Sequence, residues 1–246
     1  MPCVTRYMLH DTRECQNCKN SFIIEPDDFL FYEKIKVPPP TFCPVCRWQR
    51  IMVFRNERNL YRRKCNATGK EIISIFSTDK PFTVYDQSYW WGDAWDPLSY
   101  GREYDFSKPF FLQFRELMER VPLISLLNSN SVNSEWCNHA TQNRNCYLCF
   151  GTVESENVSY ATHSLTNKES LDLYVCEKNE LSHFNTFCER CYKTFFSIRS
   201  TDCRNSVFLM DCQNCSDCLG CVNLRNRQYC IFNEQFSKEE YEKRIR

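Results

Sequence analysis

Two cysteine pairs near the N-terminus have the spacing of a metal site. Cys15-x2-Cys18 and Cys43-x2-Cys46 are separated by 24 residues, and each pair can form a tight turn that presents two thiolates. Four thiolates make a closed tetrahedral zinc site, which leaves no coordination position for a substrate. The spacing therefore predicts one structural zinc ion held by these four residues, with buried free thiols as the alternative.

The segment after the second pair is rich in arginine. Residues 47–64 read RWQRIMVFRNERNLYRRK and carry seven basic side chains and one acid. If this segment starts as a helix, five of its arginines fall within an arc of about 140°. Guanidinium groups pair well with phosphate oxygens, so we expect contact with RNA or another nucleic acid through Arg47, Arg50, Arg55, Arg58, Arg62 and Arg63. The alternative is a solvated surface in a chain whose net charge is zero.

The C-terminal half contains a sequence repeat. Twelve of the 18 cysteines follow Pro122, the last proline, and four of them recur at one constant interval: Cys149, Cys176, Cys203 and Cys230. Short β-branched or aromatic segments bounded by Asn, Asp and Ser predict strands and turns. A period of about 27 residues is typical of stacked coils. We therefore expect a parallel β-solenoid, with a right-handed β-helix favoured, of four coils of about 27 residues in which these cysteines form a ladder.

The run DCQNCSDCLGCVNL, residues 211–224, places four cysteines at every third position. The equivalent positions of earlier repeats hold Ser, Ala, Asn and Thr, which favours packing over metal binding. One alternative remains open. In coils of the expected length, Cys188-x2-Cys191 would lie directly over Cys215-x2-Cys218, and these four thiols could hold a second zinc ion.

The elements that must position these groups fall into four segments. They are a zinc ribbon with a basic extension (1–64), a hairpin, aromatic loop and capping helix (65–122), the solenoid (123–235) and a C-terminal helix (236–246). In the ribbon, residues 21–25 and 29–35 are expected to be strands. The aromatic loop is expected to form a local core or to stack on bases. A helix from Ser107 to Pro122 and one that starts at Ser237 are expected to cover the two ends of the solenoid.

Several stretches resemble those of one group of proteins: CQNC…CPVCR, RNERNLYRRKC, YDFSKPFFLQF and YCIFNEQFSKEEYEK. The group consists of uncharacterised proteins from candidate-phyla bacteria that join an N-terminal zinc ribbon to a Cys- and Asn-rich repeat. The first pairs are also similar to a broader class of zinc-binding ribbons that end in CPxCR. The resemblance covers essentially the full chain and implies the same architecture, with zinc ligands at Cys15, Cys18, Cys43 and Cys46.

The sequence offers little for catalysis. Its four histidines stand apart from one another, and it contains no phosphate loop, dinucleotide fingerprint or nucleophile elbow. We therefore expect a non-enzymatic protein that binds RNA or a ribonucleoprotein through the arginine segment. The alternative is a protein-interaction scaffold that binds a partner protein on the solenoid surface. The sequence has neither a signal peptide nor an apolar run long enough for a membrane span, and its thiols suit a reducing compartment, so we expect a cytoplasmic location.

Overall fold

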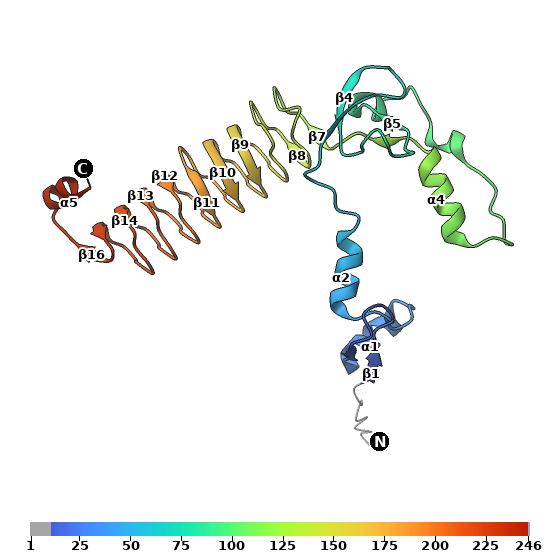
Figure 1. Ribbon diagram of the computed structural model, residues 1–246, viewed down its shortest axis with the longest axis horizontal. Helices are drawn as coiled ribbons and strands as arrows, with labels where there is room; N and C mark the ends of the chain where they lie inside the picture. The colour runs from blue at the N-terminus through green and yellow to red at the C-terminus, as the bar shows by residue number, and fades with distance from the viewer. Residues whose placement is uncertain (1–10, 246) are drawn as a thin grey trace. The chain divides into compact units, whose positions relative to one another are not determined.

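The computed structural model of the chain describes residues 11–245. The chain divides into two units, one that ends at Asn56 and one that begins at Glu57. Most of its regular elements are strands, and a β-solenoid of about nine turns spans residues 128–231 (Figure 1). The predicted fold class, mainly β with an N-terminal cysteine module and a C-terminal solenoid, is confirmed.

The first unit is an antiparallel hairpin followed by two helices. In chain order its elements are β1 (Asp11–Glu14), β2 (Ser21–Ile24), α1 (Pro26–Lys34) and α2 (Pro44–Met52). The strand predicted at residues 29–35 is therefore wrong, because most of that stretch lies in α1. Pro26 occupies the first turn of α1, and the carboxylates of Asp27 and Asp28 complement the positive end of the helix dipole.

The second unit begins with another hairpin. Its elements before the solenoid are β3 (Tyr61–Lys64), β4 (Glu71–Ser74), β5 (Val84–Tyr85), α3 (Gln87–Trp90), a 3-10 helix (Pro97–Tyr100), α4 (Phe110–Arg120) and β6 (Leu123–Ile124). The hairpin predicted around Gly69 is present, since β3 and β4 pair antiparallel. The predicted boundary between residues 64 and 65 falls inside this hairpin, because charge composition does not report strand pairing.

The aromatic loop forms a local core, which was one of its two predicted roles. The rings of Tyr85 and Tyr89 meet edge to face at 5.1 Å, and Trp95 lies 5.6 Å from Tyr85 and 5.7 Å from Trp90. The Trp90 indole Nε1–H donates to the backbone oxygen of Pro122 at 3.0 Å. These contacts fix the loop against the segment that leads into the solenoid.

Helix α4 differs from its prediction. It begins after Pro109, and the Ser107 hydroxyl donates to Asp105 at 2.6 Å instead of capping the helix. Gln113 is the one residue of α4 that is buried, while Phe110, Phe111 and Phe114 are exposed. The apolar stripe of α4 therefore does not cover the end of the solenoid.

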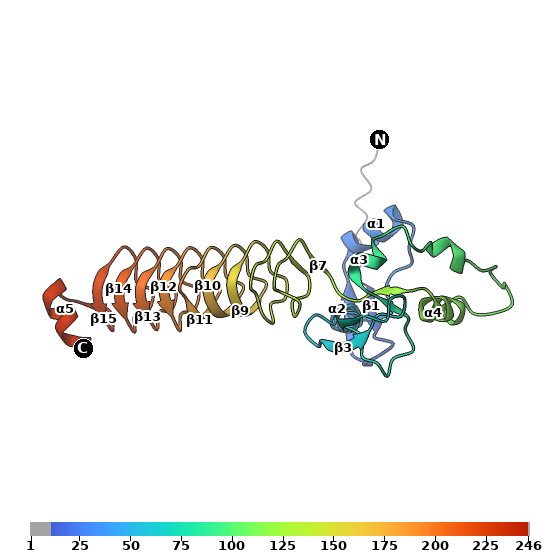
Figure 2. The same ribbon diagram turned by 90° about the horizontal axis from the view of Figure 1, so that it is seen from above.

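The solenoid coils are shorter than predicted. Inward side chains such as Asn179 bond the backbone of the residue that lies over them, Cys191, at a separation of 12 residues. Leu171 pairs with His183 and Ser216 with Gln228 in parallel register, and the same offset holds throughout the stack. Figure 2 shows the coils stacked one after another in chain order. The predicted coil of about 27 residues is therefore wrong.

The solenoid strands are short and follow one another in chain order. They are β7 (Asn128–Ser129), β8 (Ala140–Thr141), β9 (Glu156–Thr162), β10 (Lys168–Tyr174), β11 (His183–Thr186), β12 (Tyr192–Phe195), β13 (Arg204–Val207), β14 (Ser216–Leu219), β15 (Gln228–Ile231) and β16 (Glu234–Gln235). From β9 to β15 each strand pairs parallel with the next, so the coils stack without insertion.

A three-residue unit explains the coil length. The first residue of each triplet points inward and is buried, as at Asn179, and the third has a positive φ, as at Leu181 with 52°. Four triplets close one coil, so the solenoid has four sides. Asparagine is common at the third position because it tolerates the left-handed region.

The apparent period of 27 is a multiple of three but not of twelve. Cys149, Cys176, Cys203 and Cys230 therefore share the inward phase, and all four are buried. A step of 27 residues is two coils of 12 plus one triplet, so each of these cysteines lies two coils further on and on the next side. The four cysteines therefore lie on four different sides and do not form the predicted ladder. The repeat was visible in the sequence, but its assignment to one coil was wrong.

Hydrogen bonds explain why the interior is rich in small polar residues. The backbone N–H of Cys191 donates to Asn179 Oδ1 at 2.9 Å, and that of Asn179 donates to Asn167 Oδ1 at 2.8 Å. The Asn179 amide in turn donates to the backbone oxygen of Cys188 at 3.2 Å. Because buried backbone groups need partners, an inward Asn, Ser or Thr stabilises the coil that follows it.

The C-terminal end of the solenoid is closed. β16 pairs antiparallel with β15, and α5 (Lys238–Arg244) follows. The Ser237 hydroxyl accepts from the N–H of Glu240 at 3.3 Å, so the predicted helix start is correct. Tyr241 is buried, with its ring 5.8 Å from that of Tyr229. Within residues 11–245, no helix is both long and apolar enough to cross a membrane.

Candidate metal centre

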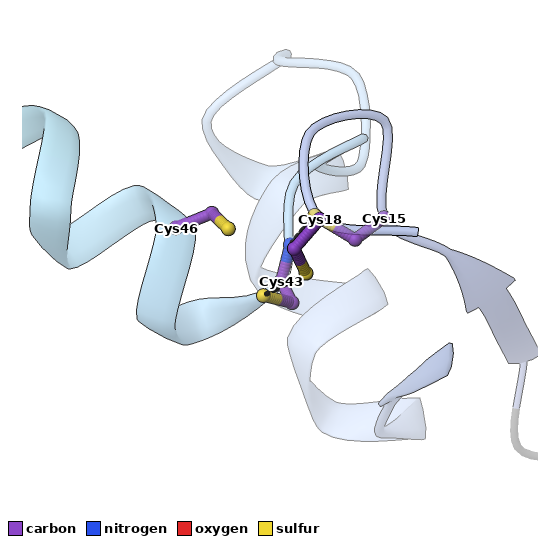
Figure 3. Close-up of side chains that lie close together, drawn as sticks. All are labelled: Cys15, Cys18, Cys43 and Cys46. Carbon is purple, nitrogen blue, oxygen red and sulfur yellow. Dashed lines mark hydrogen bonds between the residues drawn. The ribbon is translucent and has the colours of Figure 1, made fainter. Parts of the chain in front are cut away.

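The four N-terminal cysteines come together as predicted (Figure 3). Cys15 and Cys18 lie in the turn between β1 and β2, Cys43 is the N-cap of α2, and Cys46 lies in its first turn. Their sulfur atoms are all within 4.8 Å of one another. Among the residues that the structure describes, no other group of three or more possible metal ligands comes this close.

The sulfur geometry fits a tetrahedral ion. Metal–sulfur bonds of about 2.3 Å place the sulfurs of a tetrahedron about 3.8 Å apart. The Sγ atoms of Cys18 and Cys43 are 3.8 Å apart. These residues could therefore hold a metal ion with little rearrangement.

Backbone donors favour the thiolate form at one end of the cluster. The N–H of Cys43 donates to Cys15 Sγ at 3.2 Å. Burial raises the pKa of Cys15, but this N–H and those of Cys18 and Asn17 outweigh it and lower the pKa to about 6. For Cys18, the Asn20 N–H lowers the pKa, yet burial and the neighbouring thiols raise it to about 11. A cation would relieve this repulsion between like groups, which suits a metal site.

The sulfurs are part of a small core. Phe22 and Ile24 of β2 are buried beside them, and Phe29, Tyr32 and Phe42 pack against the same cluster. The unit has few other buried apolar residues, so the metal ligands and the core are nearly the same set. A metal ion here would stabilise the whole first unit.

Two of the predicted nucleic-acid contacts, Arg47 and Arg50, lie on α2. Arg47 Nη1 donates to the Tyr32 hydroxyl at 3.2 Å, and the Arg50 guanidinium lies 4.6 Å from the centre of the Phe42 ring. The helix ends at Met52, so Arg55 lies beyond it. The single helical arc expected for this segment is therefore not formed.

The other three arginines belong to the second unit. Arg58 donates to the Thr162 hydroxyl, and its guanidinium is 5.9 Å from the Phe150 ring. Arg62 lies 5.0 Å from the ring of Trp136. Arg63 donates to the backbone oxygen of Phe82 at 3.2 Å, and burial lowers its pKa. The six arginines are thus divided between the units, and Arg58, Arg62 and Arg63 are held by residues of their own unit.

The second metal group considered from the sequence is not assembled. With the observed coil length, Cys215 lies two coils beyond Cys191, with Cys203 between them, so the expected stacking in adjacent coils is wrong. Cys188 and Cys218 lie on two further sides. All of these thiols are buried, but the four sulfurs do not come within 4.8 Å of one another.

One side of the solenoid, called here the aromatic side, was not predicted from the sequence. It comprises the outward residues of the triplet that begins at Cys146 and of its equivalents in each later coil. Its members are Tyr147, Leu148, Ser159, Tyr160, Leu171, Asp172, His183, Phe184, Phe195, Phe196, Val207, Phe208, Leu219, Gly220, Ile231 and Phe232. Neighbouring rings are in contact: Phe196 stacks on Phe208 at 5.1 Å and lies tilted against Phe184 at 5.5 Å. The regular spacing of these phenylalanines is a signal that could have revealed both the coil length and this surface.

Other sides carry charged ladders. Arg190 donates to Asp202 at 2.8 Å, and Arg199 donates to Asp211 at 2.6 Å, each across one coil. The hydrogen bond from Arg190 lowers the pKa of Asp202, and that from Arg199 lowers the pKa of Asp211. Paired charges thus occur on the other sides, although the side of Arg199 and Asp211 also exposes Phe187, Ile198 and Met210.

No family model matches the chain, and the search of curated proteins found no match to it. Function must therefore be inferred from the two features that stand out in the structure. These are the closed sulfur cluster of the first unit and the aromatic side of the second.

Proposed function

We propose that the chain is a non-enzymatic scaffold whose solenoid pairs with a second copy of itself through the aromatic side. The observation that carries this proposal is the row of exposed rings along one face, which is interrupted only in the coils of Asp172 and Gly220. Of the 16 outward positions on this side, 12 are aromatic or aliphatic and Asp172 alone carries a permanent charge. A surface of this kind is costly to leave in water.

The exposed area is in the range that a stable dimer needs. Six aromatic residues of this side are between 42% and 79% exposed: Tyr147, Tyr160, Phe184, Phe196, Phe208 and Phe232. At about 200 Å² per aromatic side chain, they present roughly 600–700 Å² before the aliphatic neighbours are added. Single-chain proteins rarely expose an apolar patch above about 300–600 Å², and a standard interface buries about 800 Å² on each partner.

Periodicity favours a second copy as the occupant. Six of the eight coils of the aromatic side carry an exposed ring, and successive coils lie at the spacing of about 4.8 Å between parallel strands. A second solenoid has ridges at the same spacing, so two such faces can interlock along their length. A two-fold interface uses the same patch on both subunits, which fits one largely apolar face that runs along the stack.

The metal centre has a structural part in this proposal. Zinc is the ion that best suits four cysteine ligands at tetrahedral spacing. A closed set of four thiolates leaves no position for a substrate, so the chain works by binding rather than by catalysis. The pair of solenoids would then carry two zinc modules.

Sedimentation of the full chain tests the pairing. The wild type should have twice the 29.5 kDa mass of one chain at micromolar concentration. Phe208→Lys, which places a charge in the row of rings, should raise the dissociation constant at least ~10-fold because a desolvated lysine has no partner there. The matched control is Asn205→Lys, in the same coil and at the same kind of corner, since Lys193 already occupies that corner one coil earlier. A wild type that stays monomeric at all concentrations, or a control that dissociates equally, would contradict the proposal.

Nucleic-acid binding by the first unit is a second candidate. Trp48 is exposed on α2 between Arg47 and Arg50, and an exposed indole beside guanidinium groups suits stacking on bases and contact with phosphate. Residues Arg55, Arg58, Arg62 and Arg63 continue the basic stretch along the sequence. Trp48→Ala with Arg50→Glu should weaken RNA binding at least ~10-fold at low salt and reduce its salt dependence. Arg115→Glu, an exposed arginine of α4, is the control that should leave binding unchanged.

A further inference from the structure

The second hairpin and α3 repeat the construction of the metal centre. We propose that residues 61–90 are a second copy of the metal-binding module of the first unit. In this copy three of the four ligand positions hold other residues, and hydrogen bonds and ring packing replace the ion.

The two hairpins have the same register. β1 and β2 pair from Asp11 with Ile24 to Glu14 with Ser21, and β3 and β4 pair from Tyr61 with Ser74 to Lys64 with Glu71. Every position of the first hairpin thus has a counterpart in the second at one constant offset along the chain. Strand length, turn length and pairing all agree.

The turns are closed by the same hydrogen bonds. The N–H of Cys15 donates to Asn20 O at 2.9 Å, and that of Cys65 donates to Lys70 O at 2.8 Å. The residue four positions after each cysteine donates back to the cysteine oxygen, at 3.0 Å from Lys19 and 2.9 Å from Gly69. Both of those residues are left-handed, with φ of 65° and 71°. Gly69 therefore supplies without strain the conformation that Lys19 adopts in the first copy.

The hydrogen bonds between each turn and the segment that leads into the following helix are also repeated. The N–H of the residue after each cysteine, Gln16 or Asn66, donates at 2.9 Å to Thr41 O or Val84 O respectively. Two positions beyond that acceptor, an N-cap residue donates its N–H to the cysteine sulfur. This bond is 3.2 Å from Cys43 to Cys15, and 3.2 Å from Asp86 to Cys65. Cys43 begins α2 and Asp86 begins α3, so this half has its own constant offset, shorter than that of the hairpins.

The two offsets assign four pairs of positions: Cys15 with Cys65, Cys18 with Thr68, Cys43 with Asp86, and Cys46 with Tyr89. One of four ligands is retained. The other three positions have stabilising contacts that need no ion. Asp86 caps α3 by accepting from the Ser88 N–H at 3.1 Å, and the Tyr89 ring packs on Tyr85 at 5.1 Å.

The retained cysteine keeps the electrostatic surroundings of its counterpart. Burial raises the pKa of Cys65, but hydrogen bonds from Thr68, Asp86 and Ala67 lower it overall. These donors stand at the positions that correspond to Cys18, Cys43 and Asn17, which act in the same way on Cys15. Two unrelated turns would have no reason to share all three donors.

The second copy packs against the segment that leads into the first coil of the solenoid. Cys65, Ile72 and Val84 form a buried core of their own. β5 pairs with β6, and the N–H of Ile75 donates to Ser125 O at 2.9 Å, next to the first coil. The solenoid therefore starts on a module whose fold does not depend on a metal ion.

Restoring the missing ligands in the full chain tests this equivalence. Thr68→Cys, Asp86→Cys and Tyr89→Cys together should bind two zinc equivalents, against one for the wild type, by elemental analysis. Cobalt substitution should double the thiolate charge-transfer absorption. The matched control moves the new cysteines out of place, as Ala67→Cys, Gln87→Cys and Ser88→Cys, and should stay at one equivalent.

A second variant keeps the test decisive if the triple variant does not fold. Thr68→Cys with Asp86→Cys retains Tyr89 in the aromatic core and supplies three sulfurs together with Cys65. It should bind one additional cobalt ion with a thiolate signature. A folded variant, judged by unchanged circular dichroism, that binds no metal beyond the wild-type level would overturn the proposal.

Discussion

Cys15 of the first unit and Cys212 of the solenoid are both buried cysteines, but their surroundings shift the pKa of the thiol in opposite directions. In the first unit, backbone N–H groups point at sulfur and lower the pKa of Cys15 to about 6. In the solenoid, sulfur is the donor, as from Cys149 Sγ to Val158 O at 3.3 Å, and burial raises the pKa of Cys212 to about 11. The direction of the hydrogen bond therefore distinguishes Cys15, whose surroundings favour the thiolate, from Cys149, whose thiol is itself the donor.

The same short spacing arises in the two regions for different reasons. Cys15-x2-Cys18 is a turn that brings two sulfurs to one point. Cys188-x2-Cys191 is one step of the three-residue unit, which carries the chain to the next side of the coil. A Cys-x2-Cys pattern is therefore evidence for a metal only where the local backbone, a tight turn at Cys15 or a helix start at Cys43, brings the sulfur atoms to one point.

The largest difference between the two regions should be seen on removal of metal. Cys46→Ser, or a strong chelator, should unfold residues 11–52, because structural zinc contributes about 10–16 kcal/mol in small modules at pH 7. Hydrogen exchange should rise there and stay unchanged in residues 128–231, which belong to the other unit. Equal loss of protection in both regions would show that the solenoid also depends on metal.

A smaller effect is expected from an interior asparagine. Asn179→Leu should lower the free energy of unfolding of the solenoid by about 1–3 kcal/mol, since the buried Cys191 N–H loses its acceptor and the Cys188 oxygen keeps only the Glu177 N–H as a donor. Size alone should not be the cause, because Leu173 and Leu209 already occupy inward positions. The urea midpoint measures this effect. A leucine variant as stable as the wild type would mean that apolar packing dominates the interior.

Alkaline pH should reveal the neutral state of the buried solenoid thiols through a loss of stability. The raised pKa of Cys212 gives a contribution to stability that is fully present below about pH 8.5, the ordinary value, and is lost as the pH rises toward 11. Cys212→Ser should therefore flatten the fall in stability by about 1–2 kcal/mol at pH 10. Thermal melts of both proteins between pH 7 and 10 would measure the difference, and parallel curves would contradict the neutral-thiol assignment.

The smallest effect is expected from a single solenoid cysteine at neutral pH. Cys203→Ser should change the free energy of unfolding by about 1 kcal/mol or less, because Ser200 and Ser206 hold the adjacent inward positions and a hydroxyl can donate as the thiol does. The metal content should stay at the wild-type value. Loss of metal in this variant would place a second ion in the solenoid interior.

Some features could be read from local residues. The Cys15 and Cys43 pairs have a spacing that only a few folds use, and the Ser237 cap was recognisable from the acidic residues that follow it. Helix α1 was missed although Pro26, Asp27 and Asp28 are good helix-start residues, because the apolar run after them also matches a strand. Repetition of the cysteine turn at Cys65 was hidden because only one of its four ligands remains.

The sequence by itself determined the positions that face inward in the solenoid. Every cysteine after Pro122 lies in the same three-residue phase, and the Asn residues of the corners tolerate the positive φ that this phase requires. The tertiary structure alone decided how many triplets close a coil, and hence which residues stack. Residues one coil apart become neighbours through hydrogen bonds, as Cys191 does with Asn179, and periods of 12 and 27 are equally compatible with a three-residue phase. For the same physical reason, the arginines that are close in sequence belong to two different units, while Phe184, Phe196 and Phe208 were brought together on one face.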